Sequence, residues 1–81
     1  MKNNQFEDKF KNVINFIKQQ RKVKHINQVT MSNLLNTNRK TYNQIELGNT
    51  TMSACQLLEI SSILELDLSK IASIYNKTNK T

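Results

Sequence analysis

Cysteine, histidine and glycine each occur only once in this sequence, and proline is absent altogether. The single cysteine, Cys55, cannot form an internal disulfide, and one histidine cannot complete the usual set of metal ligands. There is no glycine-rich phosphate loop, and no pair of carboxylates lies near the histidine. We therefore expect no cofactor, no metal and no enzymatic activity, and we interpret Cys55 as a small, half-buried residue on a helix.

Long hydrophobic runs are also missing. No apolar stretch approaches the roughly 20 residues of a membrane span, and the segment MKNNQFEDKF lacks the apolar part of a signal peptide. We therefore expect a cytoplasmic protein. The 81 residues suffice for one domain with a small core, so the fold is expected to gain stability from dimerisation or to be only modestly stable.

Acidic residues are missing from the part of the chain that holds most of the basic ones. Residues 9–45 contain eight basic side chains and no acidic one, whereas residues 41–69 contain four acids and no base. The net charge of +6 is thus polarised, and a polarised basic surface favours a polyanion because binding releases condensed counterions. This pattern predicts a strongly salt-dependent affinity. The alternative is that the lysines only solvate the surface of a small protein.

Residues 26–49 predict two short helices joined by a tight turn. Asn27 is a good N-cap, because its side-chain oxygen can accept a hydrogen bond from a first-turn amide. The earlier of these two helices is therefore expected to begin near residue 28 and to end near residue 35. Asn36 follows, and asparagine is the non-glycine residue that best tolerates the left-handed backbone of a sharp turn.

The second of these helices is expected at residues 39–47, between Asn38 as its N-cap and Gly48 at the C′ position that requires positive φ. Tyr42 and Ile45 are spaced to face a core. The opposite side carries one guanidinium, one ammonium and two carboxamides, from Arg39, Lys40, Asn43 and Gln44. Such groups pair in the major groove with guanine O6/N7 and adenine N6/N7, so this stretch predicts a helix-turn-helix that reads DNA.

Three further helices complete the predicted fold, an all-α, compact five-helix bundle. One of them lies before the central pair, and its apolar stripe is formed by Phe6, Phe10, Val13, Ile14 and Ile17. Ser53 is expected to cap a fourth helix with residues 54–64, and Asp67 a last helix from residue 68 to about residue 75. We expect a single domain at residues 1–75, followed at residues 76–81 by a polar disordered tail or linker.

These features together resemble the Cro/C1-type (XRE-like) helix-turn-helix family, the five-helix DNA-binding domain of phage repressors and many bacterial regulators. The resemblance covers roughly residues 13–72. Its motifs are Ile17-Lys18-x-x-Arg21, Ile26-Asn27-Gln28, Ile45-Glu46-x-Gly48 and LLEISSILELDLSKI. The family's usual alanine and glycines are replaced here by Ser32, Asn36 and His25. Serine is small and asparagine tolerates the left-handed turn, so neither of these two replacements forbids the fold.

The resemblance implies a role for each residue of the predicted DNA-binding unit. Base contacts fall to Arg39, Lys40 and Gln44, with Asn43 as a neighbour. Contacts to the DNA backbone fall to Asn27, Gln28, Thr41, Asn49, Thr50 and Thr51. Gln28 corresponds to the family's phosphate-clamping glutamine. Lys24 and His25 either add to the near side of this surface or are merely solvated, and Leu47 either meets a thymine methyl or is covered by the following loop.

Glu46 is an acid inside the predicted DNA-binding unit. The resemblance pairs it with Arg21, in an ion pair that ties the third helix to the first and orients Arg21 toward the backbone. Loss of Glu46 is then expected to destabilise the fold. The alternative is an exposed glutamate without a partner.

The resemblance implies a sequence-specific transcriptional regulator of double-stranded DNA, a repressor associated with the nucleoid. A homodimer that reads two half-sites is expected, because one short helix reads only a few base pairs. Surplus apolar residues are candidates for the dimer interface, or ordinary core: Leu58, Ile63, Leu66, Ile74 and Tyr75. Alternatives are the DNA-binding part of a longer peptide-sensing regulator, an autoregulating antitoxin, and, from another class, a protein-binding helical module such as an antirepressor.

Overall fold

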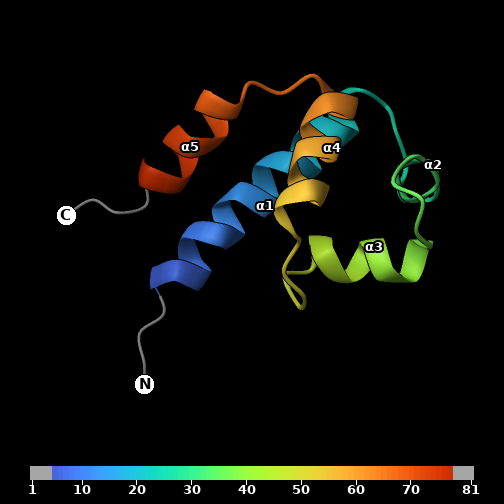
Figure 1. Cartoon of the computed structure of the whole chain (residues 1–81), viewed down its shortest axis with the longest axis horizontal. Coiled ribbons are helices and arrows are strands. Elements are labelled where there is room, and N and C mark those ends of the chain that lie inside the picture. The colour runs from blue at the N-terminus through green and yellow to red at the C-terminus, as the bar shows by residue number, and fades with distance from the viewer. Residues whose placement is uncertain (1–4, 78–81) are drawn as a thin grey trace.

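A computed structural model describes residues 5–77 of the chain, with side chains for residues 9–76. These residues form a compact all-helical fold of five helices without a strand (Figure 1), which confirms the expected fold class at this level. The helices are α1 (Gln5–Val23), α2 (Gln28–Leu34), α3 (Arg39–Glu46), α4 (Ala54–Leu64) and α5 (Leu68–Lys77). None of the described helices combines the length and the hydropathy that crossing a membrane requires.

Side chains that accept hydrogen bonds from free amides begin the three inner helices, as the sequence predicts. The Oδ1 atoms of Asn27 and Asn38 accept from the amides of Thr30 and Thr41, each at 2.8 Å. Ser53 begins α4 with a reciprocal capping box. Because each cap satisfies an amide that has no partner inside its helix, the helix boundaries are fixed locally.

Each of the four connections between the helices contains one residue with left-handed backbone. Asn36 (φ 62°) and Gly48 (φ 79°) adopt it as expected, and His25 (φ 60°) and Glu65 (φ 58°) adopt it as well. His25 closes α1, at the position where the resembled family has a glycine. The chain can therefore turn sharply after α1 and α4 without the residue type that favours this conformation.

The last helix is longer than expected. Asp67 accepts a hydrogen bond from the Ser69 amide at 3.0 Å, which begins α5 as predicted. The helix continues through Lys77, so residues 76 and 77 extend the helix and do not start the tail. The remainder of the expected tail, residues 78–81, lies outside the described residues.

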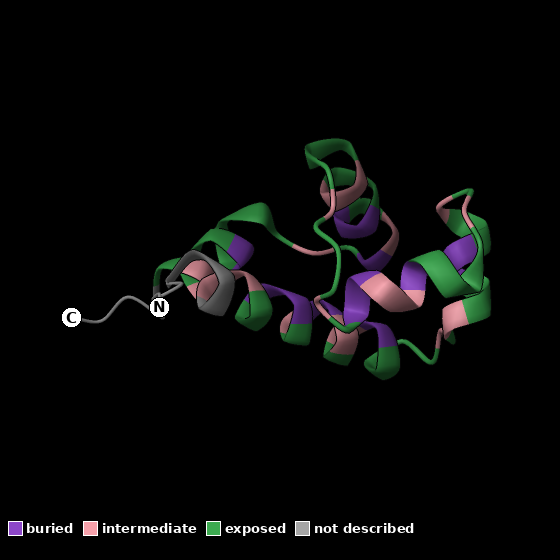
Figure 2. Ribbon diagram, turned by 90° about the horizontal axis from the view of Figure 1, so that it is seen from below, coloured by how far each residue is buried: buried purple, intermediate pink, exposed green. Residues whose placement is uncertain are grey.

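The core joins side chains from all five helices, and Figure 2 shows the buried residues on the sides of the helices that face one another. It consists of Val13, Ile14, Ile17, Met31, Tyr42, Ile45, Ile60, Leu64 and Ile71. The apolar stripe predicted for α1 supplies three of these residues, and Phe10 packs against them. The side chain of Phe6, which belongs to the same predicted stripe, lies outside the described part.

Cys55 is exposed, which corrects the expectation of a half-buried residue. The reason lies in the direction of α4, which buries Ile60 and Leu64 one turn apart and packs Leu57 against the core. At about 100° per residue, position 55 falls on the opposite side of the helix from Leu64. The thiol therefore faces away from the core.

Candidate nucleic-acid interface

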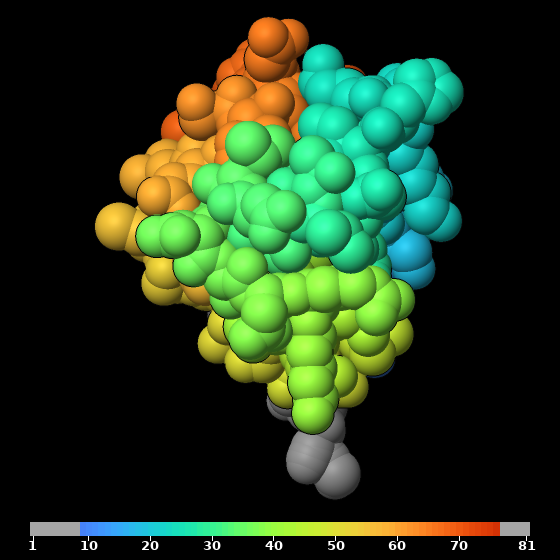
Figure 3. Space-filling model, turned by 90° about the vertical axis from the view of Figure 1, so that its right-hand side faces the viewer, coloured from blue at the N-terminus to red at the C-terminus, as the bar shows by residue number. Residues whose placement is uncertain are grey.

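Helices α2 and α3 pack against each other and share one face of the molecule, which the space-filling view presents to the reader in teal and yellow-green (Figure 3). Ser32 of α2 is buried, and its hydroxyl donates to the Val29 carbonyl at 2.8 Å. A small side chain at this position lets α3 approach closely. The turn between the helices is closed by a hydrogen bond of 2.9 Å from the Thr37 amide to the Ser32 carbonyl.

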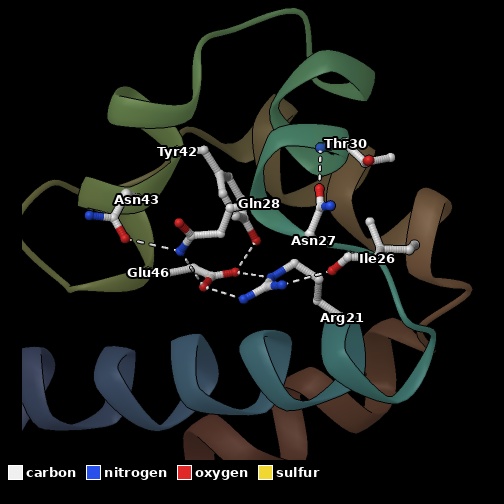
Figure 4. Close-up of polar contacts among 8 residues, drawn as sticks. All are labelled: Arg21, Ile26, Asn27, Gln28, Thr30, Tyr42, Asn43 and Glu46. Atoms are coloured by element: carbon white, nitrogen blue, oxygen red, sulfur yellow. Dashed lines mark hydrogen bonds and ion pairs between the residues drawn. The ribbon is translucent and has the colours of Figure 1, made fainter.

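A buried ion pair fastens α3 to α1, as the family resemblance implies. Arg21 Nε lies 2.6 Å from Glu46 Oε2, and Arg21 Nη2 lies 2.9 Å from Glu46 Oε1 (Figure 4). The two side chains are only 7% and 2% exposed. Two parallel, charge-assisted hydrogen bonds fix both the distance and the orientation of the two groups.

The third contact of Arg21 determines where its guanidinium points. Nη1 donates to the Ile26 carbonyl at 2.7 Å, so the side chain is directed to the protein's own backbone before α2. Since Arg21 as a whole is 6% exposed, it cannot extend to a phosphate outside. Its role is thus confined to holding α1, α3 and the start of α2 together.

Glu46 accepts further hydrogen bonds, from the Tyr42 hydroxyl and from Gln28 Nε2. Burial acts to raise the pKa of Glu46, but the hydrogen bonds from Arg21, Tyr42 and Gln28 outweigh it, and the pKa is lowered. The hydrogen bond to Glu46 raises the pKa of Arg21. The pKa of Tyr42 is raised, mainly by burial and then by the hydrogen bond to Glu46. The carboxylate therefore stays ionised inside the protein.

Acid should weaken the fold through this carboxylate. Because the folded protein lowers the pKa of Glu46, the unfolded chain binds the proton more readily, and stability rises with pH across this range. We expect the contribution of Glu46 to be complete above the ordinary glutamate pKa of 4.5 and to be lost as the pH falls through the lowered value. Urea unfolding between pH 6 and about pH 2 measures it. A Glu46→Gln variant should lose this part of the pH dependence, and an unchanged acid profile in that variant would contradict it.

Gln28 is turned inward, in contrast to the predicted phosphate clamp. Its Nε2 donates to Asn43 Oδ1 and to Glu46 Oε1, both at 3.0 Å. Both hydrogens of the carboxamide are thus used within the protein, and its remaining oxygen is an acceptor that a phosphate would repel. The side chain of Gln28 joins α2 to α3, and a phosphate contact by this residue stays a prediction.

The expected base-contacting residues share the outer side of α3. Arg39 and Lys40 are exposed and form no ion pair within the described part of the chain, and Asn43 and Gln44 are half-buried. Gln44 Oε1 accepts from Asn49 Nδ2 at 3.0 Å, which connects α3 to the next loop. The opposite side of α3 is covered, with Tyr42, Ile45 and Glu46 buried. The structure thus brings the four residues together on one accessible strip.

The expected backbone-contacting residues flank this strip, and all of them except Gln28 are exposed: Asn27, Thr41, Asn49, Thr50 and Thr51. Leu47 is 54% exposed, so the following loop does not cover it. Lys24 Nζ lies 3.5 Å from Glu65 Oε1, so the ammonium group of Lys24 is engaged in an exposed ion pair. His25 is exposed next to it.

Two further lysines lie beside α3, and the family resemblance did not assign them a contact with DNA. Lys11 lines a hollow of about 320 Å³ together with Leu47, Gly48 and residues 49–51. Lys18 lines a neighbouring hollow of about 270 Å³, which Lys11, Leu47 and Gly48 also line. Both belong to the basic part of the sequence, and only the packing of α1 against α3 shows that they border the loop after α3.

Most of the candidate dimer residues are partly covered by the core. Ile63, Leu66, Ile74 and Tyr75 are half-buried and pack against it, whereas Leu58 is 53% exposed. The Tyr75 ring is also approached by Lys9, whose Nζ lies 5.1 Å from the ring centroid. Fewer apolar side chains of this C-terminal part are therefore free for a dimer interface than the sequence suggests.

No family model matches this chain, and no curated protein or solved structure matches it at the significance that was required. The resemblance to the Cro/C1-type family therefore stays a prediction from the motifs.

Proposed function

We propose that this protein is a sequence-specific, double-stranded DNA-binding transcriptional regulator, a repressor, that reads the major groove with α3. The observation that carries the proposal is the distribution of charge on α3. Its outer side presents a guanidinium, an ammonium and carboxamides, while its one carboxylate, Glu46, is buried and neutralised by Arg21. A helix that exposes cations and amides and hides its acid suits both the phosphates and the base edges.

The surroundings of α3 support this proposal electrostatically. Lys11 and Lys18 lie near its C-terminal end, and Arg39 and Lys40 lie at its N-terminal end. The lysines near the C-terminal end can meet phosphates beside a groove, while Arg39 and Lys40 are left for the base edges. The exposed loop at residues 49–51 adds uncharged hydrogen-bonding groups near the C-terminal end.

Salt titration of duplex binding tests the function. A fluorescently labelled random-sequence duplex should bind at low ionic strength, and the affinity should fall steeply with salt, with a log–log slope of about −0.9 for each phosphate contacted. Selection from a random pool should then yield one recurring sequence. Absence of binding at about 50 mM salt, or an affinity that does not respond to salt, would contradict the proposal.

We infer that the functional unit is a homodimer formed through the side of the molecule away from α3. An apolar groove of about 420 Å³ lies between α1, α4 and α5 and is lined by Phe10, Val13, Leu57, Leu68, Ile71, Ala72, Tyr75 and Asn76. No residue of α2 or α3 lines it, so a second copy seated there leaves both helices free. Sedimentation should give twice the mass of the single chain, and a palindrome should emerge from the selection.

The same groove favours a second candidate function, a helical module that binds another protein. An apolar groove between helices can take an amphipathic helix of a partner. The two functions differ in their response to DNA, because a protein-binding module has no need of the cations on α3. If duplexes are ignored and the groove captures a helical peptide, the second function replaces the first.

A further inference from the structure

The carboxamide of Gln28 links the buried carboxylate of Glu46 to the accessible side of α3. Its Nε2 donates one hydrogen to Glu46 Oε1 and the other to Asn43 Oδ1, and each N···O distance is 3.0 Å (Figure 4). In the same view the nitrogen of Asn43 is turned away from Gln28. The three side chains thus form a chain of hydrogen bonds that runs from the interior to the surface.

The direction of each bond in this chain follows from the charge of Glu46. An ionised carboxylate only accepts hydrogen bonds. Gln28 must therefore turn its NH2 group to Glu46, because its oxygen would otherwise face a negative charge. The second hydrogen of this NH2 points at Asn43, which must then present its own oxygen. The NH2 group of Asn43 is therefore the end of the side chain that can donate hydrogen bonds at the surface.

We propose that this chain of hydrogen bonds makes Asn43 a donor toward DNA, and that Asn43 consequently selects guanine in the major groove. The inference rests on the proposed function. An asparagine that reads adenine uses both ends of its amide, accepting from N6 and donating to N7. Asn43 has its oxygen turned toward Gln28 and its nitrogen turned away from it, and guanine offers two acceptors, O6 and N7, to the N–H groups of such a side chain. Gln28 acts on the base only through Asn43 and is a positioning residue.

Gln44, on the same side of α3, is not constrained in this way. Its oxygen accepts from Asn49 Nδ2 at 3.0 Å, and neither of the two carboxamides has a charged partner within residues 9–76. Exchanging oxygen and nitrogen in both side chains preserves their hydrogen bond. Gln44 can therefore offer either end of its amide to a base, and it is the natural comparison for Asn43.

Solvent exchange of side-chain amide protons tests the direction of the chain without DNA. In NMR spectra of the full chain, we expect the Gln28 NH2 protons to exchange at least about tenfold more slowly than those of Asn43, because both Gln28 protons are hydrogen-bonded. The Asn43 NH2 should exchange at the rate of a free carboxamide. The reverse pattern, or rapid exchange of both groups, overturns the proposal.

Selection of bound duplexes from a random pool tests the base preference. The base pair read by Asn43 is the one whose preference disappears in Asn43→Ala, and the wild type should favour guanine there by about tenfold over adenine. Asn43→Asp keeps an acceptor for Gln28 and replaces the NH2 by oxygen, so guanine should no longer be favoured at that pair. Gln44→Glu changes the charge of the same side of α3 equally, and its effect should fall on a different pair.

The outcomes separate this inference from the function on which it rests. Adenine at the Asn43 pair, or an Asn43→Ala variant that binds all sequences more weakly without a change of preference, overturns the inference and leaves DNA binding in place. A wild-type protein that binds no duplex overturns both the function and the base preference, whatever the exchange rates are.

Discussion

Replacing Glu46 with alanine should lower the free energy of unfolding by about 3 to 5 kcal/mol, because it leaves the Arg21 guanidinium buried without its counter-charge. The hydroxyl of Tyr42 and one hydrogen of Gln28 lose their acceptor at the same time. A loss of this size is a large part of the stability of a small domain. Urea denaturation followed by circular dichroism measures it.

Two controls assign this loss to the buried charge. Glu59→Ala removes an exposed glutamate from α4 and should change the stability by no more than about 0.5 kcal/mol. The double variant Arg21→Met, Glu46→Leu removes both charges and should be more stable than Glu46→Ala alone, because no uncompensated charge remains. If Glu46→Ala unfolds at the same urea concentration as the wild type, the ion pair does not hold the fold.

Removing both exposed cations of α3, in the double variant Arg39→Ala, Lys40→Ala, should weaken binding to the selected duplex by about 30-fold or more. A good base contact contributes on the order of 1 to 3 kcal/mol, and the loss of two contacts multiplies the effect. Both side chains are exposed and unpaired within the described residues, so the melting temperature should hardly change. Fluorescence anisotropy at fixed salt measures the affinity.

Lys70→Ala is the matched control for this pair. Lys70 is an exposed cation on α5, which packs against α1 on the side that holds the apolar groove. Its loss removes a positive charge without touching α3, and only a small, salt-sensitive decrease in affinity is expected. Lys70→Ala removes one positive charge where the α3 variant removes two, so if it costs half the binding free energy that the α3 variant costs, binding depends on net charge and α3 does not read the bases.

Features that depend on neighbouring residues could be predicted from the sequence. Asn27 and Asn38 cap the amides three positions later, and Asn36 and Gly48 take the left-handed conformation that each turn requires. These outcomes need only local chemistry. The pairing of Arg21 with Glu46 spans 25 positions, and it was predictable only because a family resemblance supplied the partner.

Features that depend on how helices meet could not be predicted. The family resemblance predicts Gln28 as a phosphate ligand, but the packing of α2 on α3 brings Glu46 and Asn43 within reach of its amide. The sequence contains no signal for this, because nothing local prevents the side chain from facing outward. The same holds for Lys11, which borders the loop after α3 only because α1 packs beside it.

Glu46, on which two hydrogen bonds from α1 and one from α2 converge, is the final residue of α3, so this helix is secured at its C-terminal extremity. An eight-residue helix is about 12 Å long, and a tilt of about 5° around Glu46 would displace the other extremity by about 1 Å. Short carboxamides stand near the secured extremity, where small errors in position are tolerated least. The long side chains of Arg39 and Lys40 stand at the opposite extremity, where their length would absorb such a displacement.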